Sequence, residues 1–172
     1  PAIINRYPTK EENFSWFKVI STHQVAHIEF GSFRFEFATP SNIFNDTRSI
    51  LEAKQFDVIK SEDHSSELNT AIITESSITD MQRFFNLFKD RTLALDIFSI
   101  VEDGRLDTRV LSEYLGIKRA YISVQNDSII DRPEIKSLPA KEALVEFLVR
   151  ITLQKSGKTI VPSQYKVEAH KI

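Results

Sequence analysis

Histidines and acidic residues are the first candidates for chemistry in this chain. His23 and His27 are four residues apart, a spacing that would pair them as ligands for a metal ion on a helix. The surrounding pattern instead favours a strand, on which the two side chains lie about two pleats apart and too far from each other to chelate an ion unaided. His64 stands beside Glu62 and Asp63, a cluster suited to acid–base chemistry or loose cation binding. A solvated loop is the simpler explanation of this cluster, so we predict no metal site and no cofactor.

A second constellation is the tripeptide EIK at 134–136. It matches the E-x-K element with which nucleases of the PD-(D/E)xK class hold a metal and position a water. Such a site needs an earlier acidic residue, Asp96 or Asp131, on a neighbouring strand, and Pro133 interrupts the strand that this would require. No G-x-S-x-G elbow designates a nucleophile either. No catalytic residues are identified, and a small hydrolase or nuclease remains only an alternative.

Residues 108–127, TRVLSEYLGIKRAYISVQND, resemble the helix-turn-helix motif of DNA-binding proteins. That motif needs a glycine in a tight turn and apolar residues that lock two helices together. Gly116 and four apolar residues occupy these positions, namely Leu111, Leu115, Ile117 and Ile122. The resemblance implies a DNA-binding regulator whose second helix begins near Lys118. Its contacts would be Lys118 and Arg119 on phosphates, Tyr121 in the groove, and Gln125 near base edges.

A different structure fits the same segment. RAYISVQ is rich in β-branched and aromatic residues with little helical preference, and Gln125 stands where the motif places an apolar residue. In this interpretation 93–101 is a buried strand, 110–115 a short helix closed by Gly116, and 120–124 another strand. We therefore expect strand–helix–strand here and keep DNA binding as the alternative.

The clearest local pattern predicts a β-hairpin over residues 25–38. VAHIEF and FRFEFA flank Gly31-Ser32, with glycine at the first turn position, as a type II′ turn requires. The register pairs Phe30 with Phe33 and Ile28 with Phe35, which places the apolar side chains on one face. That face, including Phe37, is expected in the core rather than as a base-stacking surface of the RRM kind.

Helices near residues 10, 43, 78 and 139 are expected to cover this sheet. Thr9 and Glu12 form a capping box for a helix over 10–20, and Ser77 with Asp80 caps another. Pro139 opens a helix that Gly157 ends, with six apolar residues facing inward: Ala140, Ala143, Leu144, Phe147, Leu148 and Ile151. A Ser41-capped helix, strands at 56–59 and 71–74, a loop at 60–69 and further strand from Thr159 complete the prediction. The expected fold is α+β, one domain over 1–172, with a mixed or mainly antiparallel sheet.

Composition narrows the classes of function. The chain has 172 residues, 41% hydrophobic and 27% charged, with a net charge of −2 and no cysteine. Disulfides, thiolate metal sites and cysteine nucleophiles are therefore excluded. Four glycines offer no Gly-rich phosphate cradle, and the mildly acidic balance means that DNA binding would need a local basic patch. No apolar run reaches the roughly 20 residues of a membrane span, and the first residues lack a signal-peptide layout, so a cytoplasmic protein is expected.

These observations favour a non-enzymatic module that binds another macromolecule. A protein partner is expected, as for inhibitors, immunity proteins and viral accessory or assembly proteins, and this hypothesis predicts an exposed apolar or acidic patch. The DNA-binding alternative predicts a basic surface around Lys118 and Arg119. The identity of the partner and the oligomeric state do not follow from the sequence.

Overall fold

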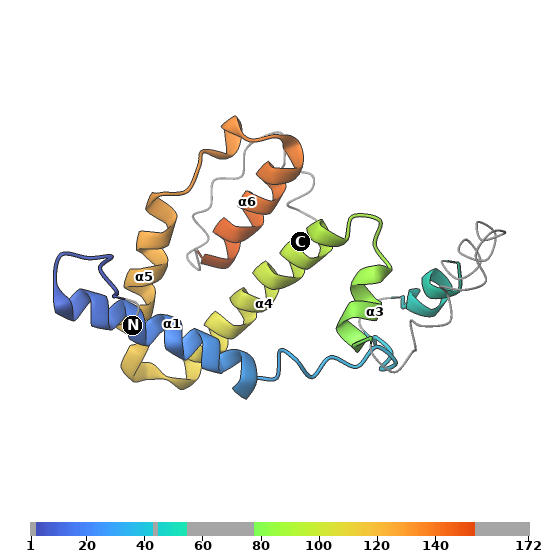
Figure 1. Cartoon of the computed structure of the whole chain (residues 1–172), viewed down its shortest axis with the longest axis horizontal. Helices are drawn as coiled ribbons and strands as arrows, with labels where there is room; N and C mark the ends of the chain where they lie inside the picture. The colour runs from blue at the N-terminus through green and yellow to red at the C-terminus, as the bar shows by residue number, and fades with distance from the viewer. Residues whose placement is uncertain (1–2, 43–44, 55–77, 154–172) are drawn as a thin grey trace. The chain divides into compact units, whose positions relative to one another are not determined.

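The chain is helical wherever the structure shows regular secondary structure. The computed structural model describes residues 3–42, 45–54 and 78–153, and these contain helices and turns without a strand (Figure 1). The expected α+β fold with a mixed or antiparallel sheet is therefore wrong for these residues. The chain divides into two compact units, one formed by residues 1–33 and 96–172 and the other by residues 34–95. Among the described helices, none combines the length and apolar character needed to cross a membrane.

The first helix, α1 (Lys10–Glu29), begins where its capping box predicts. The Glu12 N–H donates to Thr9 Oγ1 at 3.2 Å, and the Thr9 N–H donates to the Glu12 carboxylate at 3.2 Å. Both bonds satisfy N–H groups that a helix start would otherwise leave without a partner. The helix then continues past Ile20 to Glu29, through the residues expected to form the first strand of the hairpin.

Gly31 ends α1 instead of turning a hairpin, so the predicted hairpin at 25–38 is wrong. Its φ of 74° is the conformation that both a type II′ turn and a helix C-terminus require. The Ser32 N–H donates to the His27 carbonyl at 2.9 Å, which is the long hydrogen bond of a Schellman cap. Ala26 is 1% exposed whereas Ile28 is 71% exposed. The two therefore lie on opposite sides of a helix rather than on one face of a strand.

The strands expected at 93–101 and 120–124 are also helical. The helix α4 (Arg91–Glu113) is followed by the 3₁₀ turn η2 (Leu115–Ile117) and by α5 (Lys118–Ile130). On α5, Tyr121, Val124 and Gln125 are buried. This i, i+3, i+4 stripe is helical in period. Packing of that stripe outweighs the β preference of the segment, which is worth only tenths of a kcal/mol per residue.

One apolar core joins α1, α4 and α5, and Figure 1 shows α1 lying across α5. Burial of these side chains holds the three helices in fixed register, because each methylene removed from water contributes about 0.8 kcal/mol. The buried members of this core are Val19, Ala26, Leu106, Val110, Leu111, Tyr121 and Val124.

After the 3₁₀ turn η3 (Ile135–Ser137), α6 (Ala140–Leu153) packs against α5. Its start follows Pro139 as predicted. Ala143 and Phe147 are buried, Ala140 and Leu144 are exposed, and the other two expected inward residues are half-buried. A Cβ on Gly104 would lie 2.8 Å from Thr152 Cγ2, so glycine on α4 permits close approach of α6.

In the second unit, α3 (Asp80–Asn86) starts later than expected. Its capping box is Thr79 with Gln82 rather than Ser77 with Asp80. Phe84 lies on α3, with its ring centroid 5.3 Å from that of Phe35, and Phe37 is buried. The helix expected after Ser41 begins later, and covers residues 48–54, so the cap predicted at Ser41 is wrong. The predictions for 56–59, 60–69, 71–74, the Gly157 stop and the tail from Thr159 lie outside the described residues.

Candidate metal centre

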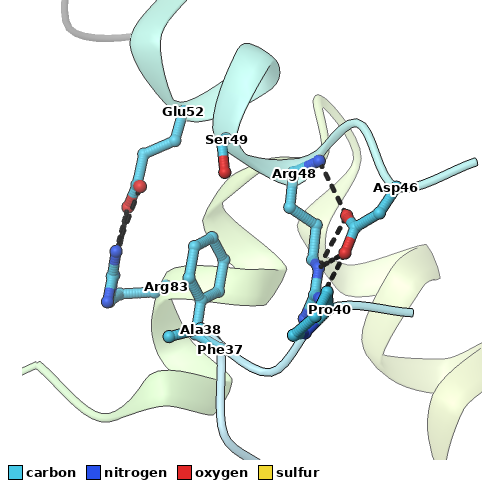
Figure 2. A pocket seen from close by; sticks show the side chains of 8 residues that line it. All are labelled: Phe37, Ala38, Pro40, Asp46, Arg48, Ser49, Glu52 and Arg83. Carbon is cyan, nitrogen blue, oxygen red and sulfur yellow. Dashed lines mark hydrogen bonds and ion pairs between the residues drawn. The ribbon is translucent and has the colours of Figure 1, made fainter. Parts of the chain in front are cut away.

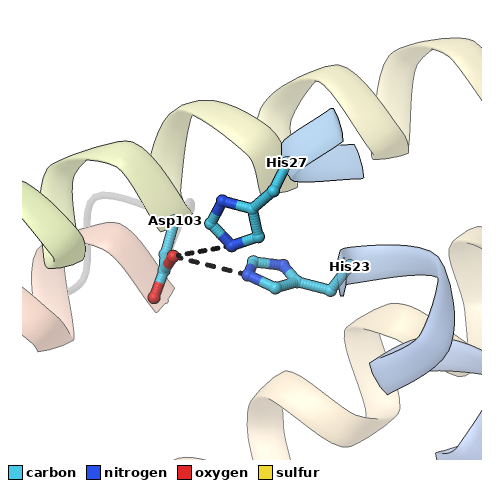
Figure 3. A group of neighbouring side chains, drawn as sticks. All are labelled: His23, His27 and Asp103. Carbon is cyan, nitrogen blue, oxygen red and sulfur yellow. Dashed lines mark ion pairs between the residues drawn. The ribbon is translucent and has the colours of Figure 1, made fainter. Parts of the chain in front are cut away.

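Two helices bring His23, His27 and Asp103 to one point (Figure 3). The histidines project from α1, one turn apart, and the carboxylate projects from α4. Nε2 of His23 lies 3.4 Å from Oδ1 of Asp103, and Nε2 of His27 lies 3.6 Å from the same oxygen. The three atoms all lie within 4.8 Å of one another. Nitrogen and carboxylate oxygen at these separations form a set of possible ligands for a metal ion.

The spacing of the two histidines in the sequence indicates this cluster, but only if the segment is a helix, and a strand was predicted there. A spacing of four places His23 and His27 side by side on a helix, whereas it separates them on a strand. The opposing carboxylates Asp103 and Asp107, also four apart, were missed because the segment before them was expected to be a strand. If both segments are taken as helices, each pair lies on one face of its helix. That the histidine pair faces the aspartate pair follows only from the packing of α1 against α4.

The far side of the His23 ring is held in the core. Nδ1 lies 2.8 Å from the Tyr121 hydroxyl and 3.1 Å from Oδ1 of Asp107. The Tyr121 hydroxyl donates its proton to Asp107 at 2.6 Å, so both of these oxygens face Nδ1 as acceptors. The proton of a neutral His23 therefore lies on Nδ1, and the lone pair lies on Nε2, toward Asp103.

The His27 ring is oriented in the same way. Its Nδ1 lies 3.0 Å from Oγ of Ser32, and that hydroxyl donates to the Glu102 carboxylate. The Ser32 oxygen is therefore an acceptor for Nδ1, which again leaves the Nε2 lone pair directed at Asp103. Ser32 reaches this place because the Gly31 cap folds the chain back over the end of α1. Arg105 completes the chain of contacts by pairing with Glu102 at 2.5 Å.

The charges around the centre favour a positive group between the rings and the carboxylate. Hydrogen bonds to Asp103 and then to Asp107 raise the pKa of His23 from 6.5 to about 9, although burial acts against the rise. Burial, together with the hydrogen bond to Asp107, raises the pKa of Tyr121, which keeps the phenol neutral. Hydrogen bonding to Arg105 lowers the pKa of Glu102 despite partial burial. Without an ion, His23 is protonated at neutral pH.

The centre lies at the boundary between core and solvent. The side chains of His23 and His27 are 18% and 20% exposed, and that of Asp103 is 49% exposed. Asp107, by contrast, is buried, and its second oxygen accepts from Gln125 Nε2 at 2.7 Å. The three possible ligands are therefore reachable from solvent, whereas the groups that orient them are fixed inside.

The residues proposed for DNA contact do not lie together on one surface. Lys118 and Arg119 are exposed at the start of α5, but Tyr121 and Gln125 are buried against Asp107. The apolar residues expected to lock the two helices also differ in burial. Leu111 is buried, whereas Leu115 is 70% exposed and Ile122 is 41% exposed. The segment therefore has helix, turn and helix in order, but the residues expected to contact DNA are divided between its surface and its core.

The other sequence candidates do not assemble a site in the described residues. Residues 135–137 form η3, so the strand that an E-x-K site would use is not formed there. His64, Glu62 and Asp63 lie outside the described residues.

A pocket in the second unit is lined by charged side chains that already have partners (Figure 2). Arg48 pairs with Asp46 at 2.5 Å, and Arg83 pairs with Glu52 at 2.9 Å while lying 4.1 Å above the Phe37 ring centroid. The Arg48 guanidinium holds the pKa of Asp46 well below its usual range. These pairs leave the pocket without an uncompensated charge among its lining groups that a ligand would neutralise.

Comparison with known proteins assigns no family to the chain. No family model matches it, and no curated protein or solved structure is significantly similar to it.

Proposed function

We propose that this protein binds a divalent transition-metal ion, zinc in particular, through Nε2 of His23, Nε2 of His27 and Oδ1 of Asp103. One observation carries the proposal. In their neutral forms both histidines direct a lone pair at the same negatively charged oxygen. Three electron-rich atoms directed at one point repel each other unless something positive lies among them. In the metal-free protein the proton on His23 supplies that charge, and a metal ion that displaces the proton fits the same point.

Two of the three separations among these atoms support zinc. Bonds of about 2.0–2.2 Å in tetrahedral geometry place neighbouring ligand atoms about 3.3 Å apart. The two Nε2-to-Oδ1 distances, 3.4 and 3.6 Å, require only small side-chain movements to reach that value. Two imidazoles with one carboxylate suit zinc better than calcium or magnesium, which prefer a shell of oxygen ligands.

The groups behind the ligands also support the proposal. Metal-bound histidines usually donate their other N–H to a carboxylate, a carbonyl or a similar acceptor, which fixes the ring and strengthens the ligand. Here the Asp107–Tyr121 pair holds the Nδ1 of His23, and Ser32 holds the Nδ1 of His27. Each ring is therefore oriented before an ion arrives.

A salt bridge alone explains only part of this arrangement. Protonated His23 pairs well with Asp103 and Asp107, but that pair does not require His27 Nε2 to point at the same oxygen. Three protein ligands leave at least one position of a four-coordinate ion to solvent or another ligand, as in catalytic rather than structural zinc sites. The proposal concerns binding of the ion, and any reaction at it would need a substrate site.

The proposal is tested by calorimetric titration of Zn²⁺ into the full chain after removal of metal with a chelator. We expect one ion per chain, and a loss of affinity of about 100-fold in His27→Gln and in Asp103→Asn, since each removes a ligand. Asp96→Asn is the matched control, because Asp96 is an exposed aspartate on the same helix. Its affinity should stay within about threefold of the wild type. Absence of stoichiometric binding, or equal effects in all three variants, contradicts the proposal.

A further inference from the structure

The helix α1 has a second apolar face that the described residues do not cover. Val19 and Ala26 are buried on its inner face, next to the histidines of the metal centre. On the other side, the exposed fractions are 59% for Phe14, 47% for Phe17, 57% for Val25 and 71% for Ile28. A helix that is apolar on both sides is usually buried on both sides, and an exposed patch of this kind marks an interface.

The spacing of the outer face favours a second copy of the same helix as its occupant. Its residues, Phe14, Phe17, Ser21, Val25 and Ile28, are separated by three, four, four and three positions. This series is the same in both directions along the helix, with Ser21 at its centre. An interface between two copies related by a two-fold axis must be complementary to itself. A symmetric apolar row on one helix meets that condition when the helix pairs with itself in antiparallel orientation.

We propose that α1 is the interface of a homodimer, in which it packs antiparallel against α1 of a second copy with the two-fold axis at Ser21. Phe14 then lies against Ile28 of the other copy, and Phe17 lies against Val25. The small side chain at the axis lets the two helices approach to the 8–10 Å that packed helices adopt. The large residues on either side fill the space beyond it.

The exposed area agrees with a reversible dimer. The four large residues expose about 400 Å² per copy, taking about 150–200 Å² for a whole side chain of this size. For both copies this is about 800 Å², which is below a standard specific interface and in the range of weak, transient ones. A dissociation constant in the micromolar range is therefore expected.

Sedimentation velocity over a concentration series tests whether the dimer forms. The wild type should shift from monomer to dimer between about 1 and 100 µM, and Ile28→Glu should remain monomeric. Ile130→Glu is the control, because Ile130 is 76% exposed at the end of α5 and away from the outer face of α1. A wild-type chain that stays monomeric to 100 µM overturns the proposal, as does an equal effect of the two substitutions.

Cross-linking tests the register. The chain has no cysteine, so introduced thiols report on single positions. Under mild oxidation Ser21→Cys should form a disulfide-linked dimer, whereas Ser123→Cys, exposed on α5, should not. Phe14→Cys should link to Ile28→Cys when the two variants are mixed, and neither should link to itself. Linkage of Phe14→Cys to itself indicates a parallel pair and overturns the proposed arrangement. The metal centre lies on the other side of α1, so dimerisation should persist in chelator, which separates this proposal from zinc binding.

Discussion

A rise in pH should destabilise the metal-free protein through one residue, His23. Asp103 and Asp107 face it from α4, Tyr121 faces it from α5, and His27 lies beside it on α1. Its pKa is raised from 6.5 to about 9, first by the hydrogen bond to Asp103 and then by that to Asp107. A raised pKa means that the folded state binds the proton more tightly than the unfolded state. The resulting stability is fully present below pH 6.5 and is lost as the pH rises through about 9.

The size of this effect follows from the pKa of His23. A rise from 6.5 to about 9 corresponds to about 3 kcal/mol if the interactions act at full strength. Asp103 is half-exposed, and solvent screens its share, which reduces the expected contribution to about 1–2 kcal/mol. This loss is a substantial fraction of the 5–15 kcal/mol by which domains are usually stable.

Urea denaturation in the presence of chelator, followed by helical circular dichroism, measures the loss. The free energy of unfolding of the wild type at about pH 6.5 and pH 9.5 is compared with that of His23→Gln, which cannot titrate at this position but can still bond to Tyr121. The wild type should lose about 1–2 kcal/mol more than the variant over this interval. Equal losses in the two proteins, or a gain in the wild type, would refute the argument that His23 is held as a charged group.

Three further predictions follow from the same structure. Asp107→Asn should lower the unfolding free energy by about 2–4 kcal/mol in urea denaturation, because both carboxylate oxygens accept, one from Tyr121 and one from Gln125, and an amide has only one oxygen to replace them; a change below about 1 kcal/mol would contradict this. Thr9→Ala should lower the unfolding free energy by about 1 kcal/mol in the same assay, because the α1 cap is lost. An unchanged unfolding free energy would contradict a stabilising role for the cap. The DNA-binding alternative predicts duplex binding, measured by fluorescence anisotropy, that weakens from about 50 to about 200 mM salt and is lost in the double variant Lys118→Ala, Arg119→Ala. Because Gln125 is buried, such binding should not depend on sequence, and a strong sequence preference would disagree with the structure.

The local signals in the sequence predicted two of the helix starts correctly, those of α1 and α6. The Thr9–Glu12 capping box and Pro139 each act within one turn of the chain, so no distant contact is needed to interpret them. The end of α1 was wrong because a positive φ at Gly31 serves a helix cap as well as a hairpin turn. Only the burial of Ala26 in the core separates these two possibilities, and that burial depends on residues far along the chain.

The metal centre illustrates a second limit of sequence interpretation. His23 with His27, and Asp103 with Asp107, each have helical spacing, but neither pair shows which other helix it faces. Their meeting depends on the core packing of α1 against α4 and α5. The β-branched residues of α5 favour a strand locally. This preference is weak, and tertiary packing overrides it. The position of Gln125, unusual for a helix-turn-helix, has a physical explanation in its hydrogen bond to Asp107.

Diffraction from crystals of the zinc-loaded protein, recorded at the zinc absorption edge, tests the central proposal most directly. An anomalous difference map locates the ion without reference to the protein atoms. The account predicts one strong peak about 2.0–2.2 Å from Nε2 of His23, Nε2 of His27 and Oδ1 of Asp103, with Asp107 and Tyr121 still on Nδ1 of His23. A peak at other residues, or no peak while His23 stays paired directly with Asp103, would contradict it.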